Sequence, residues 1–245
     1  MHPYLLHSGH LLLPTFGVLA AVGLMAALTL SLRTAVTVGL DPDKLWNAGL
    51  FTLLSAFALS RLLLILANPH SFVAYPILLL MVPSLNATGI LLTIIVTAIY
   101  LRTHSFPFLD TFDAWSPCAT LAWAFLALGH LAEGSDAGLP TMLPWGLRVP
   151  PDHTPLHPVA LYAAVVAAAL TVILLRQLPR RQHPGDTFAL ALAAAGTAQF
   201  LLTFVRQPYS DAGLLDPIQW IALGMIALAG LVLLLQPRKL VTHAV

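Results

Sequence analysis

Long apolar runs separated by short polar stretches dominate the chain. Seven of these runs approach or exceed the roughly 20 residues with which a helix crosses a bilayer. The predicted spans are approximately 11–32, 47–67, 75–101, 115–132, 157–176, 187–205 and 217–236. The pattern therefore predicts an all-α polytopic membrane protein, a seven-transmembrane-helix bundle in which residues 1–245 form a single transmembrane domain and the fourth span is the weakest.

The polar stretches between the runs have the composition of turns. DPDK at 41–44, NPH at 68–70 and QPYSDAG at 207–213 combine Pro, Gly, Asp and Asn, which favour short loops. Composition agrees with a membrane environment, because 58% of the residues are apolar and only 9% are charged, against roughly a quarter charged in soluble domains. We expect no separate soluble domain.

Basic residues are distributed unevenly between the two sides of the predicted bundle. The side with the loops after spans one, three, five and seven holds eight of them: Arg33, Lys44, Arg102, Arg176, Arg180, Arg181, Arg238 and Lys239. The other side holds Arg148 and Arg206. Because short cytoplasmic loops retain positive charge, the N-terminus is predicted outside and the C-terminus inside. The loop at 133–156, between spans four and five, therefore faces outward.

Several classes of function are disfavoured by composition. A formal net charge of +1 predicts no nucleic-acid partner. The single cysteine, Cys118, lies in the apolar stretch WSPCATLAW, which favours a packed thiol over a nucleophile. Seven histidines on the outer side would suit a metal or proton site, but none forms a helical H-x-x-x-H pair. Scattered loop histidines are the better interpretation, so we expect no metal and no cofactor.

Arg61 lies inside the second apolar run, ALSRLLLILA. Insertion scales assign a cost of a few kcal/mol to an arginine within a span, and such residues usually face the bundle interior. The predicted topology puts Arg61 within about 10 Å of the outer surface by helical rise. One interpretation is a side chain that extends to the membrane interface. We favour an anion-binding group that meets a lipid phosphate at headgroup depth.

Gln199, Thr203 and Arg206 are spaced four and three residues apart near the outer end of span six. A helix places them on one face. Such a stripe also forms ordinary hydrogen bonds between membrane helices. Because Arg61 and Arg206 come from different spans at one predicted depth, we expect them to bracket a phosphate.

His130 and Glu133 are three residues apart at the outer end of span four, in GHLAEGSDAG. On a helix they share one face. A carboxylate beside an imidazole orients the ring and favours its protonated form, as a general base for a thiol or hydroxyl requires. The alternative is a helix-end pair exposed to water, with Asp136 as a further polar group nearby.

Three segments carry a resemblance to a known family. GHL at 129–131 followed by EGSDAGLPTMLPWGLRVP and then HPVALY resembles the pattern RxGNFxNxExxGxPTxLPWGxxFP and HPxQLYE of the bacterial prolipoprotein diacylglyceryl transferases. FVRQP in span six resembles the family's FxRQP, and ALSRLLLILANPHSF resembles its GGRxxYxxFYNxxxF. The resemblance extends, with gaps, from about residue 8 to 235 and includes seven spans with an outside N-terminus.

The resemblance implies a multi-pass protein of the bacterial plasma (inner) membrane that acts on phosphatidylglycerol and a lipobox-containing preprolipoprotein. The lipobox thiol would attack the glycerol carbon of the lipid, form a thioether and release glycerol phosphate. Arg61 and Arg206 would bind the phosphate, while His157 and Tyr162 match the family's motif histidine and tyrosine. The prolines and Trp145 would hold the outward loop at headgroup level, where indole is favoured.

Most charged positions of the family's pattern are substituted in this chain. The departures from the pattern are Asn86 for a histidine, Ala127 and Gln199 for arginines, His130 and Glu133 for asparagines, and Ser135, Ala163 and Thr203 for glutamates. The favoured interpretation is a divergent transferase in which His130 and Glu133 replace lost groups. One alternative is a catalytically silent relative that binds phospholipid or lipoprotein precursor. The other is a transporter-like bundle, which the shortage of paired intramembrane charges disfavours.

Overall fold

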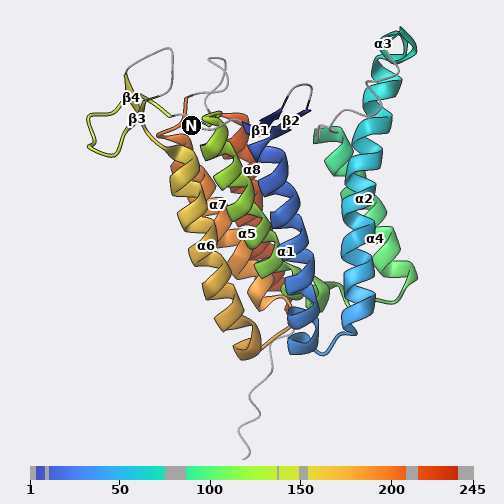
Figure 1. Cartoon of the computed structure of the whole chain (residues 1–245). Helices are drawn as coiled ribbons and strands as arrows, with labels where there is room; N and C mark the ends of the chain where they lie inside the picture. The colour runs from blue at the N-terminus through green and yellow to red at the C-terminus, as the bar shows by residue number, and fades with distance from the viewer. Residues whose placement is uncertain are drawn as a thin grey trace, which may run out of the picture.

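Helices make up most of the computed structural model, which describes residues 4–8, 11–74, 87–136, 138–148, 154–207 and 215–236 (Figure 1). The long helices are α1 (Thr15–Val38), α2 (Pro42–Ala67), α4 (Ala87–Thr103), α5 (Phe108–Glu133), α6 (Val159–Gln177), α7 (Asp186–Thr203) and α8 (Pro217–Leu235). The short elements are β1 (Tyr4–Ser8), β2 (Leu11–Pro14), α3 (Pro69–Ala74), β3 (Leu147–Arg148), β4 (Pro155–Leu156) and the 3-10 turn η2 (Leu178–Arg180).

Local sequence accounts for where several helices begin and end. Gly39 closes α1 with φ 82°, a conformation that costs a glycine little. Asp41 then caps α2, because its side chain accepts the backbone N–H groups of Asp43 and Lys44. Asp216 and Gln219 form a capping box at the start of α8. These caps satisfy N–H groups that have no partner within the helix.

Among the residues that the structure describes, five helices are long and apolar enough to cross a membrane: α1, α2, α6, α7 and α8. The helix α4 is apolar but has 17 residues. The helix α5 has 26 residues and carries Asp110 and Asp113 in its first two turns. Apart from the short strands, the chain is therefore an all-α polytopic membrane protein.

Several predicted spans have different bounds in the structure, and α2 begins at Pro42, ahead of the start predicted near residue 47. Residues 11–14 form β2 and not the start of the first span, since the residue before Pro14 is biased toward extended backbone. Residues 75–86 of the third span lie outside the described residues, and α4 begins at Ala87. The fourth span, predicted as short, is the long α5 with Pro117 inside it. Because Asp110 and Asp113 interrupt the apolar run in the first two turns of α5, the hydropathy pattern predicted a span shorter than the helix.

The helices form two groups (Figure 1). The helices α1, α5, α6, α7 and α8 pack together, and α2 pairs with α4 beside α1. Glycines allow the closest approaches. A Cβ on Gly23 of α1 would collide with Phe125 of α5, and a Cβ on Gly196 of α7 would lie 2.8 Å from the carbonyl oxygen of Ala222 in α8.

The two ends of the bundle differ, so we name them. The loop end carries the strands β1 to β4, and the turn end carries the connections from α1 to α2 and from α6 to α7 (Figure 1). At the turn end, Arg181 contacts Asp110 at 2.6 Å and Asp113 at 2.7 Å. Burial lowers the pKa of Arg181, but hydrogen bonds and charges from Asp113 and Asp110 outweigh it and raise that pKa above its ordinary value.

Candidate functional site

A polar chamber of about 540 Å³ lies at the loop end, between α5, α6, α7 and the start of α8. Its polar and aromatic lining consists of Trp123, His130, Ser135, Asp136, Gln199 and Arg206, with Gln207 beside them. Two of the residues that we predicted to share one face of span six, Gln199 and Arg206, therefore do line one cavity. His130, from α5, lines the same cavity.

Arg206 has a partner that the sequence did not reveal. Its Nη2 donates to a carboxylate oxygen of Asp136 at 2.7 Å, and the two side chains are 23% and 20% exposed. The Nε atom of Arg206 is buried and has no hydrogen-bond partner among the described residues. Because buried N–H groups are nearly always paired, the unpaired Nε makes Arg206 a candidate anion-binding group.

The loop after α5 approaches Arg206 through Gly138. Gly138 pairs with Arg206 in an isolated β-bridge, and its N–H donates to the carbonyl oxygen of His157 at 2.9 Å. Leu139 N–H donates to the carbonyl oxygen of Val205 at 2.9 Å. A Cβ at position 138 would lie 2.8 Å from the Cβ of His157 and collide with the backbone of Val205. Glycine is therefore needed where the loop passes between the His157 segment and the end of α7.

His130 is oriented by Ser135 and not by Glu133. The Nδ1 atom of His130 lies 2.8 Å from the Ser135 hydroxyl, and its ring centroid lies 4.8 Å from that of Phe16. Gly134, with φ 74°, ends α5 and turns the chain back so that Ser135 reaches His130. Glu133 is half-buried in the last turn of α5 and lines neither of the two cavities described in this section.

Trp145, His157 and Tyr162 form a hydrogen-bonded group beside the chamber. Trp145 Nε1 donates to the Tyr162 hydroxyl at 2.9 Å, and His157 Nδ1 lies 3.4 Å from the same oxygen. β3 and β4 pair antiparallel within this loop. The three residues hold the loop at the start of α6, but none of them lines the polar chamber.

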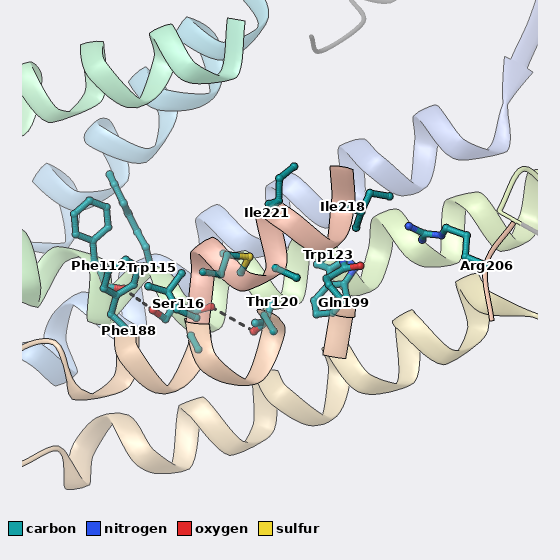
Figure 2. A pocket seen from close by; sticks show the side chains of 16 residues that line it. Phe112, Trp115, Ser116, Thr120, Trp123, Phe188, Gln199, Arg206, Ile218 and Ile221 are labelled. Carbon is teal, nitrogen blue, oxygen red and sulfur yellow. Dashed lines mark hydrogen bonds between the residues drawn. The ribbon is translucent and has the colours of Figure 1, made fainter. Parts of the chain in front are cut away.

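An apolar cavity of about 580 Å³ continues from the polar chamber (Figure 2). The two cavities share Trp123, Gln199, Arg206 and Ile218. From these residues the apolar cavity extends along α5, α7 and α8 toward Phe112 and Phe188, and Figure 2 shows Arg206 at the opposite end from these two rings. The chamber therefore opens directly into a long apolar space.

The wall of the apolar cavity offers few free polar groups. Ser116 donates to the carbonyl oxygen of Phe112 at 2.7 Å, and Thr120 donates to that of Pro117 at 3.1 Å. Their hydroxyls are thus satisfied within α5. Ile221 lines the cavity and is 65% exposed, so the cavity is open beside α8.

Thr203 and Arg61, two predicted binding residues, have other surroundings. The Thr203 hydroxyl donates to the carbonyl oxygen of Phe200 at 2.6 Å and accepts from Gln219 Nε2 at 3.0 Å, which links α7 to α8. Arg61 lies on α2, with its guanidinium 5.2 Å from the centroid of Phe72. Its Nε and Nη2 atoms are buried without a hydrogen-bond partner among the described residues.

The structure does not bring the two arginines of the predicted clamp together. Arg61 lies on α2, which packs mainly against α4 and α1, whereas Arg206 contacts the loop after α5. Neither of the two cavities includes Arg61 in its lining. The described residues also contain no group of three or more His, Cys, Asp or Glu side chains placed to hold a metal ion.

A polar chamber joined to a long apolar cavity, inside a polytopic helical bundle, defines a membrane protein suited to holding an amphipathic molecule. The family model that matches this chain, over residues 3–235, is that of the prolipoprotein diacylglyceryl transferases. The chain belongs to this family, which confirms the resemblance predicted from its motifs.

Full-length relatives support the same membership. Three proteins named phosphatidylglycerol–prolipoprotein diacylglyceryl transferase are similar to this chain. The protein of Geobacter sulfurreducens is 29% identical over 224 residues, covering 87% of this chain and 85% of the relative. That of Clostridium tetani is 25% identical over 233 residues, covering 91% and 93%. That of Tolumonas auensis is 26% identical over 253 positions, covering 97% and 96%.

Proposed function

We propose that this chain transfers the diacylglyceryl group of phosphatidylglycerol to the lipobox cysteine of a preprolipoprotein in the bacterial inner membrane. In this reaction a carbon–sulfur bond forms at the glycerol carbon of the lipid. The bond between that carbon and the phosphate oxygen breaks, and glycerol phosphate leaves. The thiol proton passes to a base in the protein.

One observation carries the proposal, namely the direct connection between the polar chamber and the apolar cavity. A phospholipid has a charged head joined to apolar chains, and the two cavities match this division. The opening beside Ile221 lies next to α8 and leads toward surrounding lipid, so a substrate can enter sideways from the bilayer. Family membership agrees with a lipid of this kind.

Within the chamber, Arg206 is the proposed phosphate-binding group. Its free Nε–H points to a hydrogen bond with an anionic oxygen, while Asp136 holds the guanidinium in position. His130 is the proposed base for the thiol, with its Nδ1 engaged by Ser135 so that Nε2 remains for the substrate. Glu133 has no assigned step, and Gln199 is the proposed polar contact at the junction of the cavities.

The remaining predicted residues have supporting roles in this proposal. His157, Tyr162 and Trp145 position the loop that supports Gly138 and Arg206. Arg61 acts separately from Arg206, as a headgroup contact on the α2 side of the bundle, which its two unpaired buried N–H groups support.

The proposed topology has seven crossings, with the N-terminus outside and the C-terminus inside. It is supported by the seven long helices among the described residues and by the excess of Lys and Arg at the turn end. The loop end then faces outward, at the surface where secreted lipoprotein precursors emerge.

The test is incubation of the purified protein with phosphatidylglycerol and a lipobox peptide, with mass spectrometry of the peptide. A mass increase by one diacylglyceryl group supports the proposal. A peptide with serine in place of the lipobox cysteine is the control and should remain unmodified. Absence of the adduct at any enzyme concentration would sink the proposed transfer.

A second candidate function is phospholipid binding without turnover. The observation that favours it is the structural bonding of Thr203 to Phe200 and Gln219, at a position where the family pattern has a glutamate. In this case the same experiment yields no adduct, while phosphatidylglycerol stays bound to the purified protein.

A further inference from the structure

Three aromatic side chains line the end of the apolar cavity that lies farthest from Arg206. Phe112 of α5 and Phe188 of α7 stack with ring centroids 4.9 Å apart. Trp115 meets Phe112 edge-on, with centroids 6.2 Å apart. All three line the cavity, as Figure 2 shows. We call Phe112, Trp115 and Phe188 the aromatic floor.

The buried residue Asp113 anchors the aromatic floor. It directly follows Phe112 in α5 and accepts the backbone N–H of Phe188 at 2.8 Å. It also accepts from Gly185 N–H and from Arg181, each at 2.7 Å. Because one carboxylate joins the two helices that carry the stacked rings, these helices cannot separate at the floor without breaking charge-assisted hydrogen bonds.

The depth of the apolar cavity matches the length of lipid chains. Phe112 and Trp123 are eleven residues apart on α5, as are Phe188 and Gln199 on α7, which corresponds to about 16 Å at the helical rise. One leaflet of a bilayer contributes about 15 Å of hydrocarbon. A chain whose head lies in the polar chamber therefore reaches the floor when it is about as long as ordinary bilayer chains.

We propose that the aromatic floor sets the maximum acyl-chain length of the phospholipid that this protein accepts. The inference rests on the proposed function, because the head of that lipid must occupy the polar chamber. Moving a chain from lipid into this cavity exchanges one apolar environment for another, so extra length brings little hydrophobic gain. A chain longer than the cavity has to displace packed rings, which lowers its affinity about tenfold or more. The selection is one-sided: long chains are excluded and shorter chains are tolerated.

The experiment measures which lipids the purified full-length protein retains. The protein, in detergent, is mixed with an equimolar series of saturated phosphatidylglycerols, from chains shorter than those of common bilayer lipids to longer ones. Native mass spectrometry then identifies the bound lipid by its mass. For the unmodified protein, we expect bound lipid to fall about tenfold beyond one chain length.

Substitutions in the floor should move this limit in opposite directions. Phe188→Leu and Phe112→Leu each remove ring volume and should admit longer chains, while Phe188→Trp should exclude chains that the unmodified protein accepts. Leu190→Ala is the matched control, because Leu190 lies two residues from Phe188, is 38% exposed and does not line the cavity. Each variant is first checked for its thermal midpoint, and the two leucine variants test the same limit from different helices.

Three results would overturn the inference. Folded Phe188→Leu and Phe112→Leu proteins with an unchanged limit would show that the floor is not what chains meet. Retention by the unmodified protein regardless of chain length would show that long chains leave through the opening beside Ile221, and the proposed function would stand. If the unmodified protein retains no phosphatidylglycerol of any length, both the inference and the proposed function fail.

Discussion

Two arginine–aspartate pairs at opposite ends of the bundle have the same contact distance but different surroundings. Arg181 and Asp113 meet at 2.7 Å at the turn end, and Arg206 and Asp136 meet at 2.7 Å at the loop end. Asp113 is fully buried and accepts three N–H donors. Arg206 leaves its buried Nε without a partner among the described residues. The carboxylate of the first pair has all its hydrogen bonds within the protein, whereas the arginine of the second pair has an unused N–H donor.

A structural ion pair and a binding group can be told apart in this molecule by their unused hydrogen-bond donors. Buried polar groups are nearly always hydrogen-bonded in a stable fold. The ion pairs of Arg181 with Asp113 and Asp110 are structural, because they hold α5 to the segment that follows η2. A pair with an unused buried N–H next to a cavity has capacity for a ligand.

Asp113→Ala should produce the largest effect, and the effect should be on stability. It leaves Arg181 without one partner and the N–H groups of Gly185 and Phe188 without an acceptor. Breaking a buried pair in this way costs about 3–5 kcal/mol. The measurement is the thermal midpoint of the purified protein in detergent. Asp43→Ala, at an exposed position in the first turn of α2, should change it little, and equal midpoints for both variants would contradict the structural role.

Arg206→Gln should instead reduce transfer. Loss of the phosphate contact should lower the rate of adduct formation about a hundredfold. The loss of stability should be smaller than for Asp113→Ala, because Asp136 is 20% exposed whereas Asp113 is fully buried. The rate is measured by mass spectrometry of the lipobox peptide. Arg148→Gln is the control, because Arg148 is exposed on β3 at the same end. Equal rates for the two variants would remove Arg206 from the site.

Ser135→Ala tests whether the chamber depends on the orientation of His130. Loss of a hydrogen bond worth about 0.5–1.5 kcal/mol should lower the transfer rate about three- to tenfold. Stability should stay close to that of the unmodified protein, since Ser135 is exposed. Ser71→Ala, on the exposed α3, provides the comparison. An unchanged rate in the Ser135 variant would argue against His130 as the base.

Tyr162→Phe should have the smallest effect, about 1 kcal/mol or less in transfer or stability. It removes the hydroxyl that accepts from Trp145 and contacts His157. Trp145→Phe should produce a similar change, and the double variant should be no worse than either single variant if the pair acts as a unit. Additive losses would show that the two side chains act independently.

The helices and the family followed from local sequence, because hydropathy and turn residues act within a few positions. Asp41 and Pro42 mark the start of α2, and Gly39 the end of α1. Errors occurred where local signals conflicted, as at β2 before Pro14 and in the charged first turns of α5. Of the site, Arg206, Gln199 and His130 were predicted to be polar groups near the outer surface, and the structure puts them in one chamber.

A polytopic helical membrane protein with the motifs of one transferase family follows from the amino-acid sequence alone. Which polar groups meet depends on how the helices pack. Asp136 and Arg206 are seventy residues apart in sequence, and the apolar cavity is bounded by α5, α7 and α8 together. Helix packing also separates Arg61 from Arg206, although the sequence predicted the same depth in the membrane for both residues. Depth follows from position along one helix, whereas contact depends on how the helices pack around one another.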